Sequence, residues 1–221
     1  MINTAVDDTG RDLVDHEKQK NEFMKRNGQT HQSWELSVNL KNPTRKATTI
    51  KELAGKADLL VPKNDPDSIV KVDDFQKLGG HPIASPALSA AGIEIVAYTK
   101  EQVDAEKAKQ AEEAKKNPKP NIGEAIAGAF GEMFNMGGGP NSITVQMKDP
   151  KGMVADVEFQ DESGNKIKGN GWSSSGNRTT KESKTYNFQT KLPDTTRLVI
   201  YLATPKSVVT VPLTLKDVFL P

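Results

Sequence analysis

The chain has 221 residues, which is long enough for two domains of about a hundred residues each. Its 30 Lys and Arg residues nearly balance its 29 Asp and Glu residues, so no strong field favours nucleic acid or an anionic membrane as a partner. The absence of cysteine excludes disulfides, thiolate catalysis and cysteine-ligated zinc. The three histidines lack the spacing that places two rings on one metal ion, so we predict neither a metal site nor a cofactor.

Targeting and membrane signals are weak in this sequence. Residues 1–10 contain no basic segment followed by an apolar core, so we expect no signal sequence in this chain. The most apolar stretch, residues 82–98, contains two prolines, a glycine and a glutamate, which argues against a membrane-spanning helix. We therefore expect no transmembrane segment.

The first predicted element is a tight turn at residues 7–10. The triplet Asp8-Thr9-Gly10 is the one in which aspartic proteases carry a catalytic carboxylate, which makes Asp8 a candidate catalytic residue. Glycine also supplies the positive φ that a tight hairpin requires, and an acidic side chain beside it bonds backbone amides. We favour the hairpin turn, with a protease-like Asp8 and a calcium-binding loop as the alternatives.

Several strands are predicted to follow in residues 1–100, which we assign to a first β module. Apolar residues alternate with polar ones over residues 36–40, as in a strand that packs one face on a core. Short β-branched alternations over residues 67–78 and 92–101 predict further strands, separated by a loop rich in glycine and proline.

Residues 101–140 form a predicted helical linker. Alanine and paired opposite charges over residues 100–116 indicate a solvated helix or a stiff spacer. A short amphipathic helix follows, which either packs against a sandwich or docks on a partner or lipid surface. Its apolar face supplies the candidate partner-docking residues, which are Ile122, Ile126, Phe130 and Phe134. A glycine-rich hinge ends the linker.

Residues 141–221 form the predicted second β module, which contains a long polar loop at residues 168–184. The loop carries one aromatic residue, Trp172, and an exposed tryptophan can stack on a carbohydrate or another ligand. We therefore name Trp172, Asn170 and Arg178 as candidate ligand-binding residues, although we favour a tryptophan packed back on its own sandwich over one that contacts a ligand. This module has no histidine, which excludes a Ser-His-Asp triad within it.

An internal repeat links the two modules. "AVDDTGRDL" at residues 5–13 parallels "FQDESGNKI" at residues 159–167, and residues 36–50 parallel residues 198–211 in the same order. Glu162 stands where the repeat would need the second aspartate of a protease dyad, and its longer side chain would misplace the carboxyl group. The repeat therefore favours two turns over half of an active site.

The second copy resembles immunoglobulin-like and fibronectin-like modules of bacterial exported and surface proteins. The segments that carry this resemblance are "VEFQDESGNKI" and "TYNFQTKLPDTTRLVIYLATPKSVVTVPLTLKDVFLP", whose alternating strands resemble the last strands of such a sandwich. The resemblance implies a mainly β fold with two immunoglobulin-like β-sandwich modules, joined by the charged helical linker and the amphipathic helix.

The resemblance also implies a non-catalytic, extracytoplasmic protein, periplasmic or on the cell surface, that binds another protein or a cell-envelope component. Because the first copy begins almost at its hairpin, we expect its opening strand to be missing, supplied from elsewhere in the chain, or replaced by a partner strand. An unprotected edge strand would also permit self-association. A carbohydrate-binding module that uses the Trp172 loop and a hydrolase that uses Asp8 are the alternatives.

Overall fold

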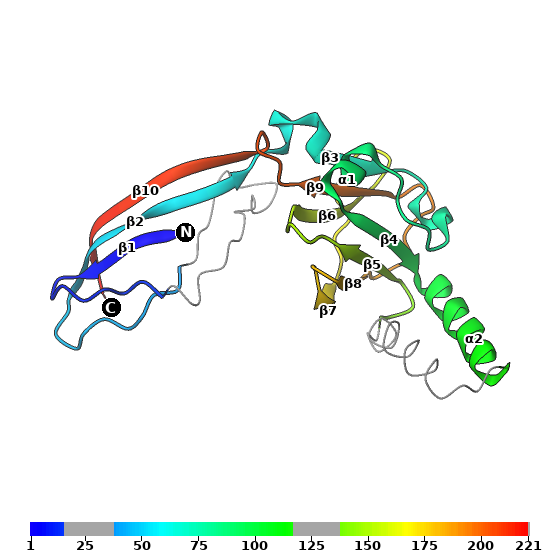
Figure 1. Ribbon diagram of the computed structural model, residues 1–221, viewed down its shortest axis with the longest axis horizontal. Coiled ribbons are helices and arrows are strands. Elements are labelled where there is room, and N and C mark those ends of the chain that lie inside the picture. The colour runs from blue at the N-terminus through cyan, green and yellow to red at the C-terminus, as the bar shows by residue number, and fades with distance from the viewer. Residues whose placement is uncertain (16–37, 117–137, 221) are drawn as a thin grey trace. The chain divides into compact units, whose positions relative to one another are not determined.

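The computed structural model describes residues 1–15, 38–116 and 138–220, and it confirms a mainly β chain (Figure 1). The described chain forms two compact units. We call Met1–Pro66 with Ala203–Pro221 the ribbon unit and Asp67–Leu202 the sandwich unit. The sandwich unit is thus inserted, in sequence, between the two parts of the ribbon unit.

A three-stranded antiparallel sheet forms the ribbon unit. Its strands β1 (Ile2–Asp7), β2 (Thr49–Leu60) and β10 (Val208–Phe219) lie in the order β1-β2-β10. Strands β2 and β10 pair in one register from Leu60 opposite Val208 to Thr49 opposite Phe219, so they form a long two-stranded ribbon. Two segments that are about 150 residues apart in sequence are therefore neighbours, as a non-local antiparallel pair allows.

The core of the ribbon unit is small and lies on one face of its sheet. Its buried hydrophobic residues come from β1, β2 and the segment after β1, and they are Ile2, Ala5, Leu13, Val14 and Leu53. Four partly buried side chains pack against them, which are Val38, Leu40, Ile50 and Leu213. Only Leu213 comes from β10, so most of the length of this strand adds nothing to that core.

Two antiparallel sheets that share one hydrophobic core form the sandwich unit. The first has the order β3-β9-β6, with β3 (Ile69–Val72), β9 (Arg197–Leu202) and β6 (Val154–Gln160). The second has the order β4-β5-β8-β7, with β4 (Glu94–Thr99), β5 (Ser142–Lys148), β8 (Lys181–Asn187) and β7 (Gly171–Asn177). Residues of both sheets, such as Val145 and Ile200, are fully buried in the shared core.

Aromatic rings lie at the centre of this core. Phe159 on β6 contacts Phe75, Tyr186 and Phe188, with ring centroids 5.1 to 5.7 Å apart in tilted or edge-on geometry. Such pairs stabilise a core by about 0.5–1.5 kcal/mol beyond the area that they bury. Phe159 therefore joins the first sheet to the strand β8 of the second sheet and to the segments that flank the sheets.

The helices belong to the sandwich unit or to its boundary. They are α1 (Pro86–Ala91), α2 (Lys100–Lys116) and three short 3₁₀ helices, Pro62–Asn64, Pro66–Ser68 and Phe75–Leu78. The predicted helix over residues 100–116 is confirmed as α2, which begins directly after β4 and contacts β4 and β5. A salt bridge of 2.9 Å between Glu101 and Lys191 fixes its first turn. No helix of the described chain has the length and apolar character needed to cross a membrane.

The division into units differs from the predicted modules 1–100, 101–140 and 141–221. The predicted final strand of the second module, β10, pairs with β2 of the ribbon unit instead. Apolar alternation shows that a segment is a strand, but it does not show which strand is its neighbour. The expectation that the opening strand before the first hairpin is missing, supplied from elsewhere or replaced by a partner strand is wrong, because β1 itself precedes that hairpin, and β10 adds beside β2 instead.

The strand order also bears on the immunoglobulin-like resemblance. In that fold the second strand pairs with the fifth, and the seventh lies beside the sixth. In the sandwich unit the second strand, β4, pairs with the third, β5, and the seventh strand, β9, lies between the first and the fourth in the other sheet. A two-sheet sandwich is present, but its connections are not those of an immunoglobulin domain.

Candidate functional site

The triplet Asp8-Thr9-Gly10 forms the predicted turn. The amide of Asp7 donates to the carbonyl of Arg11 at 3.1 Å, and the amide of Gly10 donates to the carbonyl of Asp7 at 3.0 Å. Gly10 has a φ of +86°, a conformation that a side chain makes costly. The chain then returns beside β1, where the amide of Leu13 donates to the carbonyl of Ala5 at 2.7 Å.

The two carboxylates of this turn hold the backbone in place. Asp7 is fully buried and accepts hydrogen bonds from the Thr9 hydroxyl at 2.7 Å and from the amides of Thr9, Arg11 and Thr44 at 2.9 to 3.0 Å. Burial alone would raise the pKa of Asp7, but these donors outweigh burial and lower it. The Thr48 hydroxyl, at 2.7 Å, and the Thr48 amide lower the pKa of Asp8.

These contacts argue against the protease-like role of Asp8. A catalytic aspartate pair shares one proton, so one of its two pKa values must be raised. The pKa values of Asp7 and Asp8 are both lowered by donors that stabilise the ionised form. Among the described residues, no group of three or more His, Cys, Asp or Glu side chains is placed to hold a metal ion, so the calcium alternative gains no support either.

The repeated turn has the same backbone geometry. In the sandwich unit the amide of Asp161 donates to the carbonyl of Asn165 at 2.9 Å, and the amide of Gly164 donates to the carbonyl of Asp161 at 3.0 Å. Gly164 has a φ of +83°, and the amide of Ile167 donates to the carbonyl of Phe159 at 2.7 Å. The predicted repeat of the turn is therefore confirmed bond by bond.

The parallel between residues 36–50 and 198–211 does not extend to strand pairing. Strand β6, which precedes the second turn, pairs with β9, whereas β1, which precedes the first turn, pairs with β2. Leu40, which stands where Leu202 of β9 stands, makes only an isolated bridge to Val14. The repeat is thus one of a turn and its two arms, and not of a whole module.

The predicted ligand-binding loop is a β-hairpin and not an open loop. Residues 171–177 form β7, which pairs with β8 in one unbroken register. Trp172 is 61% exposed, and the ammonium group of Lys184 on β8 lies 4.1 Å from the centre of its ring. Glycine and serine have low intrinsic strand propensity, so only the cross-strand pairing identifies β7.

The three predicted ligand-binding residues do not converge. Asn170 precedes β7, and its amide donates to the carbonyl of Asn187 at 2.8 Å. Arg178 follows β7, and its side chain donates to the Glu182 carboxylate at 2.8 Å and to the carbonyl of Val154 at 3.0 Å. The seven-residue strand between Asn170 and Arg178 spans about 20 Å, so a small ligand cannot contact both. The predicted docking residues, Ile122, Ile126, Phe130 and Phe134, lie outside the described residues.

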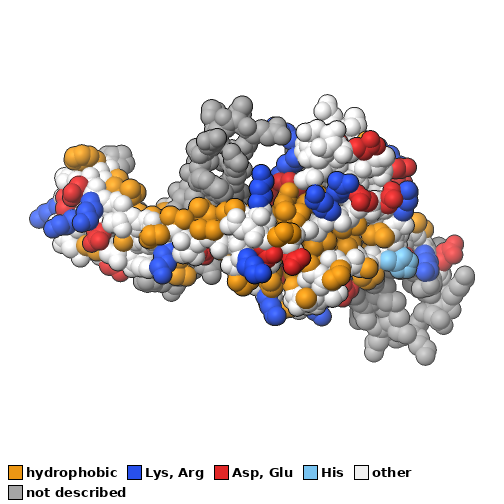
Figure 2. Space-filling view, turned by 90° about the horizontal axis from the view of Figure 1, so that it is seen from above, with side chains coloured by type: hydrophobic (Ala, Val, Ile, Leu, Met, Phe, Trp, Pro, Cys, Tyr) orange, Lys and Arg blue, Asp and Glu red, His pale blue; other side chains and the backbone are white. Residues whose placement is uncertain are grey.

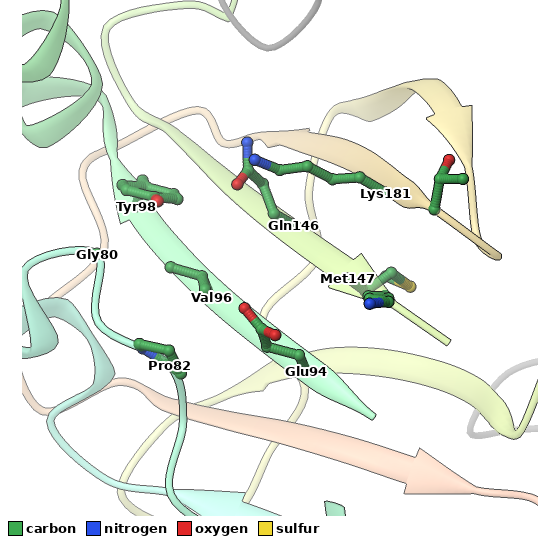
Figure 3. Close-up of a pocket in the computed structure, with 10 residues that line it drawn as sticks. Gly80, Pro82, Glu94, Val96, Tyr98, Gln146, Met147 and Lys181 are labelled. Carbon is green, nitrogen blue, oxygen red and sulfur yellow. The ribbon is translucent and has the colours of Figure 1, made fainter. Parts of the chain in front are cut away.

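A shallow hollow lies on the face of the four-stranded sheet that points away from the shared core (Figure 3). Its volume is about 270 Å³, and its lining includes Glu94, Tyr98, Gln146, Lys148 and Lys181. Ligand pockets for small molecules usually measure about 300–1,000 Å³, so this hollow is small by comparison. Its lining as described contains no histidine.

Tyr98 forms one wall of this hollow, and its ring lies against the backbone of Gly80 (Figure 3). A methyl group at residue 80 would come within 3.0 Å of the ring, which explains the glycine. Burial first, and then the charges of Glu106 and Glu94, raise the pKa of the Tyr98 hydroxyl. Tyr98 therefore stays neutral at physiological pH and can act only as a neutral hydrogen-bonding group.

An apolar surface on the ribbon is the most distinctive feature of the described chain. Seven large hydrophobic side chains are exposed in the described residues, and five of them lie on β10, which are Val209, Val211, Leu215, Val218 and Phe219. Leu215 is 54% and Phe219 is 83% exposed. Figure 2 shows hydrophobic side chains in a row along this part of the molecule.

Strand pairing explains why three of these side chains share one face. Val209, Val211 and Leu215 alternate along β10 and lie opposite Leu59, Ala57 and Leu53 of β2. Leu53 belongs to the core of the ribbon unit, so the apolar face continues along the ribbon beyond that core. The other face carries Val218 as well as Thr210, whose hydroxyl donates to the carboxylate of Asp58 at 2.6 Å.

The sequence contains the signal for this surface. "VVTVPLTLK", residues 208–216, alternates apolar and polar residues, and Pro212 is a residue that sheets accept only at their edges. This alternation by itself predicts a strand of the second module with one face on a core. Only the pairing with β2 shows that most of this face has no second layer among the described residues.

No protein-family model, no curated protein and no solved structure matches the chain. The arguments for function therefore rest on the surfaces and contacts described above.

Proposed function

We propose that the protein is a non-catalytic binding protein that contacts a partner protein through the apolar face of β10. The observation that carries this proposal is the set of exposed apolar side chains on one strand, with Val209, Val211 and Leu215 on one face. Soluble proteins seldom expose a contiguous apolar surface without a binding role. Burying such side chains in water-free contact contributes about 25 cal/mol for each Å² of apolar area.

The partner that fits this surface is another protein with an apolar strand or helix face. Aliphatic side chains in a row match such a face, whereas a polar polymer would leave them without contacts. The charges near the ribbon are mixed, with Lys56 and Asp58 on β2 and Lys216 and Asp217 on β10, so they favour neither a strongly acidic nor a strongly basic partner.

The compartment remains part of the proposal. A location outside the cytoplasm, and a partner in the cell envelope, follow from the resemblance to exported modules alone. The immunoglobulin-like assignment behind that resemblance receives support from the two-sheet sandwich and none from its strand order.

Photo-crosslinking in the cell that makes the protein tests the proposed surface. A photoreactive phenylalanine analogue replaces Val209, Val211 or Leu215 in the full chain, and Thr210 or Thr214 in matched controls on the opposite face of the same strand. We expect one discrete adduct with another protein from the apolar positions and none from the controls. Equal adducts from both faces, or no adduct from the apolar face, would show that this face binds no partner.

The carbohydrate-binding alternative has one favourable observation, the exposure of Trp172. Sugar-binding surfaces use aromatic rings with open faces, and the ammonium group of Lys184 lies over the Trp172 ring. Among the described residues of the sandwich unit, Trp172 is the one exposed large aromatic side chain. The contacts of this residue therefore favour the interaction-protein proposal over a sugar-binding module.

A further inference from the structure

Most edge strands of the described sheets have a feature that blocks further pairing. Exposed edges present free amides and carbonyls to other chains, so proteins cover, shorten or charge them, or place a proline there. The edge of β10 has Pro212 and the charged residues Lys216 and Asp217, and β3 is four residues long and carries Lys71. These two edges are poor templates for another strand.

The other edges are covered by the chain itself. On β4 the amide of Ile83 donates to the carbonyl of Ile95 at 2.8 Å, so the segment before α1 covers that edge. The returning arms of the two repeated turns cover β1 and β6, through the bonds from Leu13 to Ala5 and from Ile167 to Phe159. Each arm adds only a short bridge, but it occupies the edge at that place.

Strand β7 is the exception. It is the outermost strand of the four-stranded sheet, it has seven residues, and it carries no proline and no charged side chain. Its register with β8 is unbroken from Gly171 to Asn177, so no bulge turns it away from a partner. Six of its seven residues are exposed. No other segment of the described chain pairs with its outer side.

The sequence of β7 is complementary to itself. In an antiparallel pair of two β7 strands centred on Ser174, each Ser173 lies opposite Ser175 of the other copy, and each Trp172 lies opposite Gly176. A methyl group at residue 176 would clash with the carbonyl oxygen of Lys181, so this position disfavours a side chain and leaves room for the indole. An aromatic ring over a cross-strand glycine is a known stabilising pair in sheets.

We propose that two copies of this chain associate by antiparallel pairing of their β7 strands, with Ser174 on the two-fold axis. The pairing joins two four-stranded sheets into one continuous sheet of eight strands across the dimer. A second copy fits better than a different partner because no charge on β7 is brought opposite itself, and because large and small residues match in this register. This inference does not depend on the proposed function of β10.

The dimer should be weak. Stable interfaces usually bury about 1,200–2,000 Å² in total, and one short strand of serine and glycine on each side buries less. Association is therefore expected at high protein concentration, with exchange between monomer and dimer.

Charge substitution at the two-fold axis tests the register. In this pairing, residue 174 faces its own copy, so Ser174→Lys places two positive charges opposite each other, and Ser174→Glu places two negative charges opposite each other. We expect each variant alone to dimerise at least about tenfold more weakly than the natural chain. A mixture of the two variants should restore association, because a lysine then faces a glutamate.

The matched control is Ser173→Lys, which adds the same charge to the same strand. Residue 173 faces Ser175 of the other copy and not itself, so this variant should keep most of the association. Sedimentation velocity of the full chains over a range of concentrations measures each constant, and thermal unfolding of each variant shows that the fold is retained.

A second readout uses the absence of cysteine from the chain. Ser174→Cys then carries the single thiol of its chain, which should form a disulfide-linked dimer under mild oxidation. Ser173→Cys should form such a dimer far more slowly alone, but readily when mixed with Ser175→Cys. A monomer at all concentrations, equal weakening by Ser173→Lys and Ser174→Lys, or no recovery in the mixture would overturn the proposal.

Discussion

The turns at Asp7 and Asp161 have the same backbone hydrogen bonds but different surroundings. Asp161 is partly buried and accepts from the amide and the side chain of Asn165, at 2.8 and 3.0 Å, all within its own turn. Asp7 is fully buried and also accepts from the amide of Thr44, 37 residues away. The same local sequence therefore makes the same turn, and the tertiary structure decides whether its carboxylate also anchors a distant segment.

Replacing each aspartate by asparagine should give the largest difference between the two turns, because only Asp7 also holds a distant segment. Asp7→Asn replaces one acceptor oxygen by an NH₂ group that faces backbone donors, so we expect about tenfold to hundredfold loss of amide protection at Leu13. Asp161→Asn keeps its local acceptor, and we expect a change of about twofold or less at the matching amide of Ile167. Native-state hydrogen exchange of both variants measures the two amides.

Equal losses of protection at Leu13 and Ile167 would contradict the comparison. In that case the bond from Thr44 would add nothing to the local bonds that both turns share.

Lowering the pH should also distinguish the buried Asp7 from the partly buried Asp161. The pKa of Asp7 is lowered in the folded chain, so its contribution to stability is present above its unfolded pKa of about 4 and is lost as pH falls toward the lower folded pKa. We expect the ribbon unit to become less stable between about pH 4 and pH 2, and Asp7→Asn to flatten this dependence. Urea unfolding at a series of pH values, with the Leu13 amide as the reporter, measures it.

Asp161→Asn is the control for the acid experiment, because its carboxylate also has a lowered pKa but bonds only within its own turn. A pH dependence that is unchanged in Asp7→Asn would mean that other carboxylates, such as Asp8, cause the acid sensitivity of the ribbon unit.

The glycines should show where the two turns are alike. Gly10 and Gly164 have φ values of +86° and +83°, and an added methyl group would meet no atom within 4 Å at either residue. Backbone strain alone then sets the cost, so Gly10→Ala and Gly164→Ala should each destabilise their own unit by about 1 kcal/mol. Chemical denaturation of each variant gives the two values. A difference of more than about 1 kcal/mol between them would show that the turns are not equivalent.

The smallest expected effect concerns the hydroxyl groups of the turns. The Thr9 hydroxyl donates to the Asp7 carboxylate at 2.7 Å, so Thr9→Ala should destabilise the ribbon unit by about 0.5–1 kcal/mol. Ser163 occupies the matching place beside the more exposed Asp161, and Ser163→Ala should change stability by less than about 0.5 kcal/mol. Thermal unfolding of both variants compares them, and a larger effect for Ser163→Ala would reverse the expected order.

The comparison of the two units also explains why sequence patterns gave part of the fold. Strands with strong β-branched alternation, such as β4 and β9, lie where the sequence predicts them. The helix α2 also follows its alanine and charge pattern. Strand β7 was missed, because serine and glycine gain strand structure here only from pairing with β8.

The candidate functional surfaces were also only partly predictable from the sequence. The β10 alternation was visible in the sequence, but its exposure was not, because a pattern of period two indicates one apolar face and does not show what covers that face. The sequence favours a Trp172 ring packed back on its own sandwich over an exposed one, but the side chain is 61% exposed. The separation of Asn170 from Arg178 required the strand between them.

The sequence by itself determined the local structures of this protein: the two acidic turns with their glycines, the stronger strands and the helix that begins at Lys100. These depend on φ preferences, on side-chain periodicity and on hydrogen bonds within a few residues of each other. Only the tertiary structure decided that β10 pairs with β2 and that Asp7 is a buried anchor. Both depend on contacts between residues far apart in sequence, which local preferences cannot specify because many strands offer the same alternating face.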